Sequence, residues 1–90
     1  MKTTATEIKA ALDELHDLPA RVGGWEVETG IDSADEPAVW VWALLEDEEV
    51  DFADRSRLRE MVRECVRQRA GDAVWAYVRF RGVSEMAQTA

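Results

Sequence analysis

The chain has 90 residues and a formal net charge of −8, which suits one domain with a modest core and argues against general binding along phosphate backbones. No apolar run is long enough to cross a membrane, and the amino terminus lacks the apolar core of a signal peptide. The single cysteine, Cys65, cannot form an internal disulfide, which agrees with a reducing compartment. We therefore expect one cytoplasmic domain over residues 1–90, with short flexible termini at about 1–3 and 84–90.

Charge is distributed unevenly along the chain. Residues 1–54 contain 15 acidic and 3 basic side chains, whereas residues 55–81 contain 3 acidic side chains and 8 arginines. Such asymmetry can steer association with a partner, or it can mean only solvated faces that pair with one another. The sequence leaves both alternatives open.

The first predicted element is a helix of about fifteen residues, a length estimated from its apolar spacing and from a cap at Thr3 or Thr4. Its apolar face is formed by residues at helical spacing: Ile8, Leu12 and Leu15. Pro19 ends the pattern because proline disfavours helical geometry in the residue before it. His16 has nearby carboxylates, but one imidazole on a helix is a weak signal, so we predict no metal site.

Two strands joined by an acidic loop follow the first helix. Residues 25–29 alternate apolar and acidic side chains, which is typical of a strand with one buried face. Residues 30–37 have the glycine, proline and short polar side chains of a hairpin loop. The stretch 37–47 is unusual because both of its alternating faces are apolar, one with Trp40 and Trp42. A layer of helices covers only one face of a sheet, so something else must cover the second face of this strand.

A second helix is predicted from about Phe52 or Arg55 to Arg69. The acidic run before it suits the positive end of the helix dipole, and Gly71 is placed to terminate it. Cys65 falls on the apolar stripe of this helix, which favours a buried, unreactive thiol over a nucleophile.

An arginine stripe recurs at four-residue spacing on the outer side of the same helix. Its members are Arg59, Arg63 and Arg67. Interleaved glutamates can pair with them in a solvated surface, or the stripe can grip phosphates or an acidic protein.

The last strand, residues 73–81, also alternates clearly. Its small and apolar face belongs under the helices: Val74, Ala76, Val78 and Phe80. We expect an α+β two-layer sandwich in αββαβ order. Its three-stranded, mostly antiparallel sheet would have strand order 2-1-3 and two helices on one face.

In this fold the helix-free face of the sheet carries a set of aromatic and arginine side chains. The predicted interface residues are Trp40, Trp42, Trp75, Tyr77, Arg79 and Arg81. Tryptophan, tyrosine and arginine are enriched at protein interfaces, and contiguous exposed aromatic area indicates a partner. Two alternatives stay open: the tryptophans fill the core and the small side chains face outward, or the carboxyl-terminal tail covers the patch.

We therefore expect a non-enzymatic interaction module that self-associates or belongs to a small two-protein complex. The alternative is a nucleic-acid-binding domain with stacking on Trp75 or Tyr77 and these arginines: Arg59, Arg63, Arg67, Arg79 and Arg81. No cofactor is predicted. The sequence has one histidine, no Cys/His pairing and no recognisable phosphate loop, so it offers no catalytic residues to assign.

Three short stretches of the sequence carry a resemblance. They are Asp-Ser-Ala-Asp-Glu-Pro-Ala-Val-Trp-Val at 32–41, Arg-Ser-Arg-Leu-Arg-Glu at 55–60 and Tyr-Val-Arg-Phe-Arg-Gly-Val-Ser-Glu at 77–85. Over roughly residues 22–85 the chain resembles a group of small uncharacterised bacterial proteins that are often encoded beside a small helical protein of the HEPN type. The resemblance implies a partner within a two-gene, toxin–antitoxin-like module, and it transfers no catalytic residues.

Overall fold

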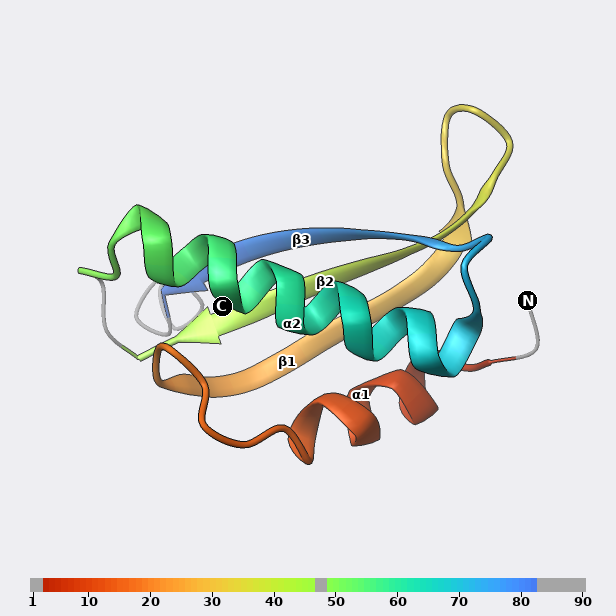
Figure 1. Cartoon of the computed structure of the whole chain (residues 1–90). Helices are drawn as coiled ribbons and strands as arrows, with labels where there is room; N and C mark the ends of the chain where they lie inside the picture. The colour runs from red at the N-terminus through yellow and green to blue at the C-terminus, as the bar shows by residue number, and fades with distance from the viewer. Residues whose placement is uncertain (1–2, 47–48, 83–90) are drawn as a thin grey trace, which may run out of the picture.

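The computed structural model describes residues 3–46 and 49–82, and its elements follow the predicted αββαβ order (Figure 1). The elements are α1 (Ala5–Asp13), β1 (Val22–Ile31), β2 (Pro37–Leu45), α2 (Phe52–Ala70) and β3 (Trp75–Gly82). The termini predicted to be flexible lie, apart from Thr3, outside the described residues. Both helices lie on the same side of the sheet in Figure 1, with α2 across the strands and α1 beside β1.

The sheet has the order β1-β2-β3, so the predicted order 2-1-3 is wrong. β1 and β2 are antiparallel, whereas β2 and β3 are parallel, which makes the sheet mixed and not mostly antiparallel. The two apolar faces of β2 explain its central position, because a central strand is covered more completely than an edge strand. β1 and β3 alternate apolar with charged side chains, which suits exposed sheet edges.

The core lies between the helices and one face of the sheet. Val39 and Val41 of β2 are fully buried there, as predicted, and by strand register they neighbour Thr29 and Val27 of β1. The alternative in which the tryptophans of β2 fill the core is therefore wrong. The helices and the other two strands complete the core with Ile8, Leu12, Trp25, Leu58, Val62, Val66, Ala76 and Val78.

The first helix is shorter than predicted. It has 9 residues and begins with a capping box, in which the Thr4 side chain accepts a hydrogen bond from the Glu7 backbone and Glu7 accepts one from Thr4. The helix ends before Leu15, and Asp17 adopts a positive φ of 54°, which a right-handed helix does not allow. Leu15 still packs against the core, which explains why its spacing resembled that of a longer helix.

The second helix begins at Phe52, the first of the two predicted starts, after the N-cap Asp51, whose side chain accepts a hydrogen bond of 2.8 Å from the Asp54 backbone. It ends at Ala70 and is followed by the C-cap Gly71, whose φ of 94° is costly for other residues. Cys65 is buried on its inner face, and burial raises the pKa of the Cys65 thiol, with opposing effects from nearby charges. The buried position of this cysteine agrees with the prediction. Within the described residues, neither helix combines the length and the apolar character needed to cross a membrane.

Candidate functional site

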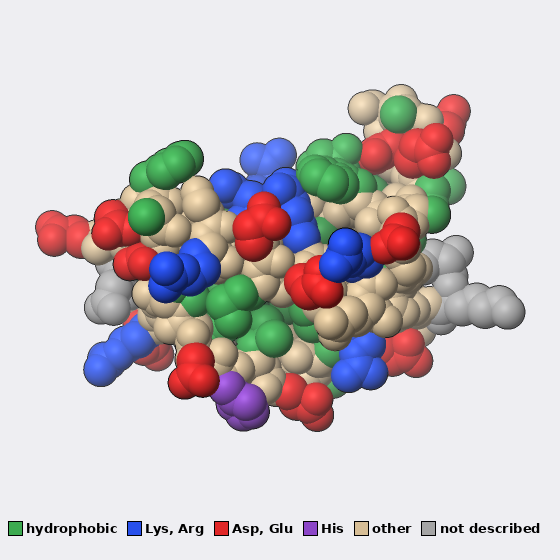
Figure 2. Space-filling view, viewed as in Figure 1, with side chains coloured by type: hydrophobic (Ala, Val, Ile, Leu, Met, Phe, Trp, Pro, Cys, Tyr) green, Lys and Arg blue, Asp and Glu red, His purple; other side chains and the backbone are tan. Residues whose placement is uncertain are grey.

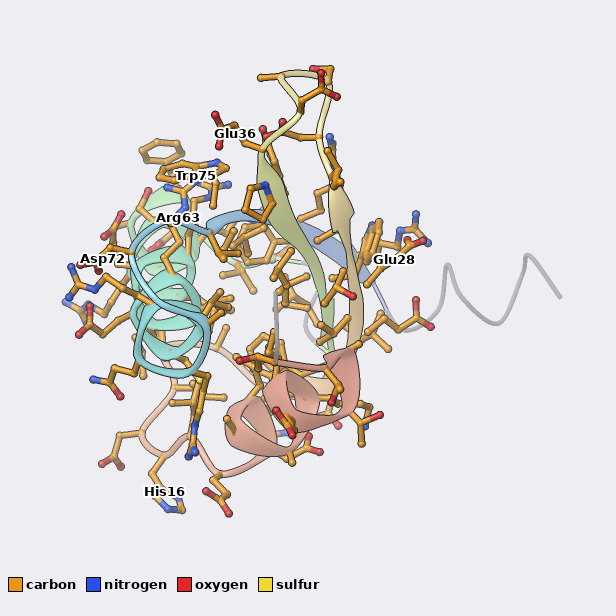
Figure 3. The ribbon with its side chains drawn as sticks, turned by 90° about the vertical axis from the view of Figure 1, so that its right-hand side faces the viewer. His16, Glu28, Glu36, Arg63, Asp72 and Trp75 are labelled. Atoms are coloured by element: carbon orange, nitrogen blue, oxygen red, sulfur yellow. The ribbon has the colours of Figure 1, made fainter. Side chains whose placement is uncertain are left out.

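The helix-free face of the sheet is built from three parallel columns of side chains. Strand register sets the glutamates of β1 beside the tryptophans of β2, and these beside the aromatic and basic side chains of β3. Two cross-strand rows define the face: Glu28–Trp40–Tyr77 and Glu26–Trp42–Arg79. Figure 3 shows Glu28 on the side of the sheet opposite α2. The face is therefore acidic along one edge strand, aromatic along its centre and basic along part of the other edge strand.

Trp40 and Tyr77 form a stacked pair on this face. Their ring centroids are 5.7 Å apart and their planes differ by 14°. Gly30 of β1 makes room for the pair, because a Cβ at that position would lie 3.2 Å from Cζ3 of Trp40. The Trp40 ring thus lies close to the backbone of β1 and stacks against Tyr77.

A hydrogen bond holds Tyr77 to the β1–β2 hairpin. Tyr77 Oη donates to Asp32 Oδ2 over 3.0 Å, while Asp32 Oδ1 accepts from the backbone amides of Ala34 and Glu36 at 2.9 and 3.1 Å. The hydrogen bond from the Glu36 amide contributes most to lowering the pKa of Asp32, and the hydrogen bond to Asp32 raises the pKa of Tyr77. The sequence pattern predicts the hairpin loop but not this contact, which joins residues 45 positions apart.

Trp42 lies in the middle of the face, beside Arg79 by register and under the guanidinium of Arg81. The Cζ atom of Arg81 is 5.5 Å from the centroid of the Trp42 ring, which is a cation–π contact. The indole Nε1 of Trp42 is buried, and it has no hydrogen-bond acceptor among residues 3–46 and 49–82. Within the described fold, Trp42 therefore contributes ring surface and no directional hydrogen bond. Trp40, Trp42 and Tyr77 are all partly exposed.

Trp75 does not join these rings, contrary to the prediction. The guanidinium of Arg63 on α2 lies 4.4 Å from the centroid of the Trp75 ring, so this tryptophan lies against the helix (Figure 3). Arg63 Nε also donates to the carbonyl of Ala76 over 3.2 Å. Since β3 is an edge strand, its first side chain can turn over the open edge towards α2. Trp75 remains 51% exposed in this position.

Two of the three arginines in the stripe of α2, Arg59 and Arg63, contact β3 and do not lie on the outer side of the helix as predicted. The Cζ atom of Arg59 lies 5.3 Å from the centroid of the Phe80 ring, one helical turn before the contact of Arg63 with Trp75. Arg67 forms an ion pair with Glu64 on the same helix, and its Nε atom lies 3.7 Å from Asp72 Oδ1. These contacts, and not a free phosphate-binding row, account for much of the stripe.

A basic hollow of about 480 Å³ lies beside the carboxyl-terminal half of β3. Four arginines line it: Arg55 and Arg59 from α2, and Arg79 and Arg81 from β3. Its other described lining residues are Trp42, Val78 and Phe80, so the described lining contains no Asp or Glu side chain. Figure 2 shows Lys and Arg side chains gathered in the region where Figure 1 draws β3 behind α2. Arg55 was not among the predicted site residues, although it lies four residues before Arg59 on the same helix face.

A second hollow, of about 570 Å³, lies between α1 and α2. Its apolar floor includes Ala11, Leu15, Met61 and Cys65, and its rim carries charges of both signs. The matching i, i+4 spacing of the two floor pairs is the sequence signal that could have indicated it. The mixed rim gives no preference for one kind of ligand.

The described residues contain no group of three or more His, Cys, Asp or Glu side chains that could hold a metal ion. Comparisons of the chain with protein-family models, with curated proteins and with solved structures found no match.

Proposed function

We propose that the chain is a non-enzymatic, cytoplasmic protein-interaction module that self-associates through the helix-free face of its sheet. The observation that carries this proposal is the aromatic column of Trp40, Trp42 and Tyr77, which lies on the side of the sheet opposite α2. Aromatic side chains bring large contact area at low entropic cost, and together with arginine they dominate the binding energy of protein interfaces. A small domain also gains stability when a partner covers its apolar surface.

Light scattering over a range of concentrations tests this proposal, with Trp42→Arg as the disrupting variant. A charged side chain in the middle of the face should weaken self-association by about 100-fold or more, since it adds a desolvation cost and removes an aromatic contact. Trp75→Arg is the matched control, because Trp75 is exposed but lies against α2. Far-UV circular dichroism would confirm that both variants fold.

We expect a wild-type dimer that Trp42→Arg dissociates and Trp75→Arg preserves. A wild-type chain that stays monomeric at all concentrations would overturn self-association. A chain that is monomeric alone but binds a small helical protein of the kind implied by the sequence resemblance, through this same face, would favour the two-protein form of the proposal.

The second candidate function is nucleic-acid binding at the basic hollow. The observation in its favour is the presence of four arginines beside an aromatic ring, without a carboxylate among the described lining residues. It differs from the sequence prediction in using Arg55 in place of Arg63 and Arg67, which lie against Trp75 and Glu64. Its aromatic rings are also different, because Trp42 and Phe80 line the hollow and the predicted Trp75 and Tyr77 do not.

Fluorescence anisotropy of a labelled single-stranded RNA at low salt tests this candidate. Arg55→Glu should weaken binding, whereas Arg57→Glu, which reverses a charge beside the α1–α2 hollow, should weaken it much less. Absence of low-salt binding by the wild-type chain would exclude it.

A further inference from the structure

The charge pattern of the helix-free face restricts how two copies can meet. Glu26 and Glu28 are exposed along β1, and Arg79 and Arg81 are exposed along β3, with the tryptophans of β2 between them. Opposite charges therefore occupy opposite edge strands of one face. The sign of charge changes across the strands and is constant along each of them.

A symmetric dimer that packs face to face has two simple choices of twofold axis. An axis parallel to the strands places β1 of each copy over β3 of the other. An axis across the strands, in the plane of the sheet, places β1 over β1 and β3 over β3. Only the first choice sets glutamates against arginines, while the second sets like charges against each other.

Edge-to-edge dimers face the same restriction. A twofold axis normal to the sheet pairs β3 with β3 or β1 with β1, so arginines would neighbour arginines, or glutamates would neighbour glutamates. Like charges on directly neighbouring strands are destabilising. The charge pattern thus disfavours the continuous-sheet dimers that open edge strands otherwise invite.

We infer that the partner at this face is a second copy whose strands run parallel to those of the first, about a twofold axis along β2. This inference rests on the proposed function and specifies its geometry. Rotation about such an axis leaves the position of each residue along the strand direction unchanged. Each cross-strand row therefore packs against the same row of the second copy. The row Glu26–Trp42–Arg79 then places Glu26 opposite Arg79 of the second copy, and Trp42 opposite Trp42.

The dimensions of packed sheets agree with this arrangement. Stacked sheets lie about 10 Å apart and are rotated by roughly 30°, a gap that aromatic side chains fill and that long Glu and Arg side chains can bridge at the margins. Each ion pair occurs twice because of the twofold symmetry. Association should therefore also weaken as salt concentration rises.

A charge exchange tests the inferred arrangement. Glu26→Arg alone makes all four side chains at positions 26 and 79 of the homodimer positive, and Arg79→Glu alone makes all four negative. Each variant should therefore self-associate about 100-fold more weakly than wild type. When the two variants are mixed, both ion pairs are restored, one in its original direction and one reversed, so a heterodimer with near wild-type affinity should form. Native mass spectrometry separates this heterodimer from either homodimer by mass.

The controls reverse single charges on α2, away from the face. Glu60→Arg and Arg57→Glu should dimerise like wild type and should not prefer each other when mixed. Two results would overturn the inferred geometry while leaving the face as the interface: both face variants dimerising like wild type while Trp42→Arg is monomeric, or both being weakened without rescue on mixing. A monomeric wild-type chain would instead overturn the proposed function on which the inference rests.

Discussion

Gly30 determines how close the Trp40 ring can lie to the sheet. A Cβ at Gly30 would come within 3.2 Å of this ring, which is closer than ordinary van der Waals contact. We expect Gly30→Ala to displace Trp40 from its stack on Tyr77 and to reduce the near-UV circular dichroism of the aromatic side chains. Gly24→Ala is the matched control, because a Cβ there would make an ordinary contact of 3.5 Å with Leu44. An unchanged aromatic spectrum in Gly30→Ala would contradict the close packing of ring and strand.

The contact between Asp32 and Tyr77 predicts a dependence of stability on pH. Hydrogen bonds lower the pKa of Asp32 in the folded chain, so its contribution is complete above the ordinary value of about 3.9 and is lost as the pH falls through the folded value. The pKa of Tyr77 is raised, so its contribution is complete below about 10 and is lost as the pH rises through the folded value.

Urea unfolding of wild type, Asp32→Asn and Tyr77→Phe measures both effects. The difference in the free energy of unfolding between wild type and Asp32→Asn should shrink as the pH falls below about 4, since asparagine does not titrate. The difference between wild type and Tyr77→Phe should shrink above about pH 10. Differences that stay constant across these ranges would show that the contact does not couple protonation to folding.

At the scale of elements, β2 shows how much of the fold could be predicted. The elements, their order and the core face followed from periodicity, because Val39 and Val41 alternate with the tryptophans as a strand requires. The same observation contained the strand order, since a strand with two apolar faces belongs at the centre of a sheet. Periodicity within one strand does not show which strands lie beside it. The prediction that β1 is central came instead from the general preference for right-handed crossover connections.

Hydrogen exchange distinguishes the two strand orders experimentally. In the observed order, β2 has a paired neighbour on both sides, whereas β1 and β3 each have one side without a strand partner among residues 3–46 and 49–82. We expect the slowest-exchanging strand amides, measured by NMR, to lie in β2, for example at Val41. Slowest exchange in β1, for example at Val27, would support the order 2-1-3 instead.

The candidate site was predicted less completely than the fold. Alternation correctly placed Trp40, Trp42 and Tyr77 on the face away from the core, because these residues lie within paired strands. It failed for Trp75, where the ring turns over the open edge to Arg63. The position of a side chain at a strand end depends on which helix lies beside it, and the sequence pattern does not contain that information.

At the scale of the whole molecule, the uneven charge of the chain becomes a feature of one surface. The acidic first half supplies β1 and the arginine-rich second half supplies β3, while the neutral, aromatic β2 separates them. The face is therefore complementary to itself under one twofold rotation. The hollow between α1 and α2 contains no residue of the aromatic column, whereas the basic hollow beside β3 shares Trp42 with it.

The four tryptophans provide a direct measurement of the central claim, that the helix-free face is a contact surface between two copies. Trp40 and Trp42 lie on this face, Trp25 is buried in the core, and Trp75 lies against α2. Two-dimensional ¹H–¹⁵N NMR resolves one indole signal from each. On dilution, the signals of Trp40 and Trp42 should shift together along one binding curve, while those of Trp25 and Trp75 stay in place. Stationary signals from Trp40 and Trp42, or a shift confined to Trp75, would contradict the claim.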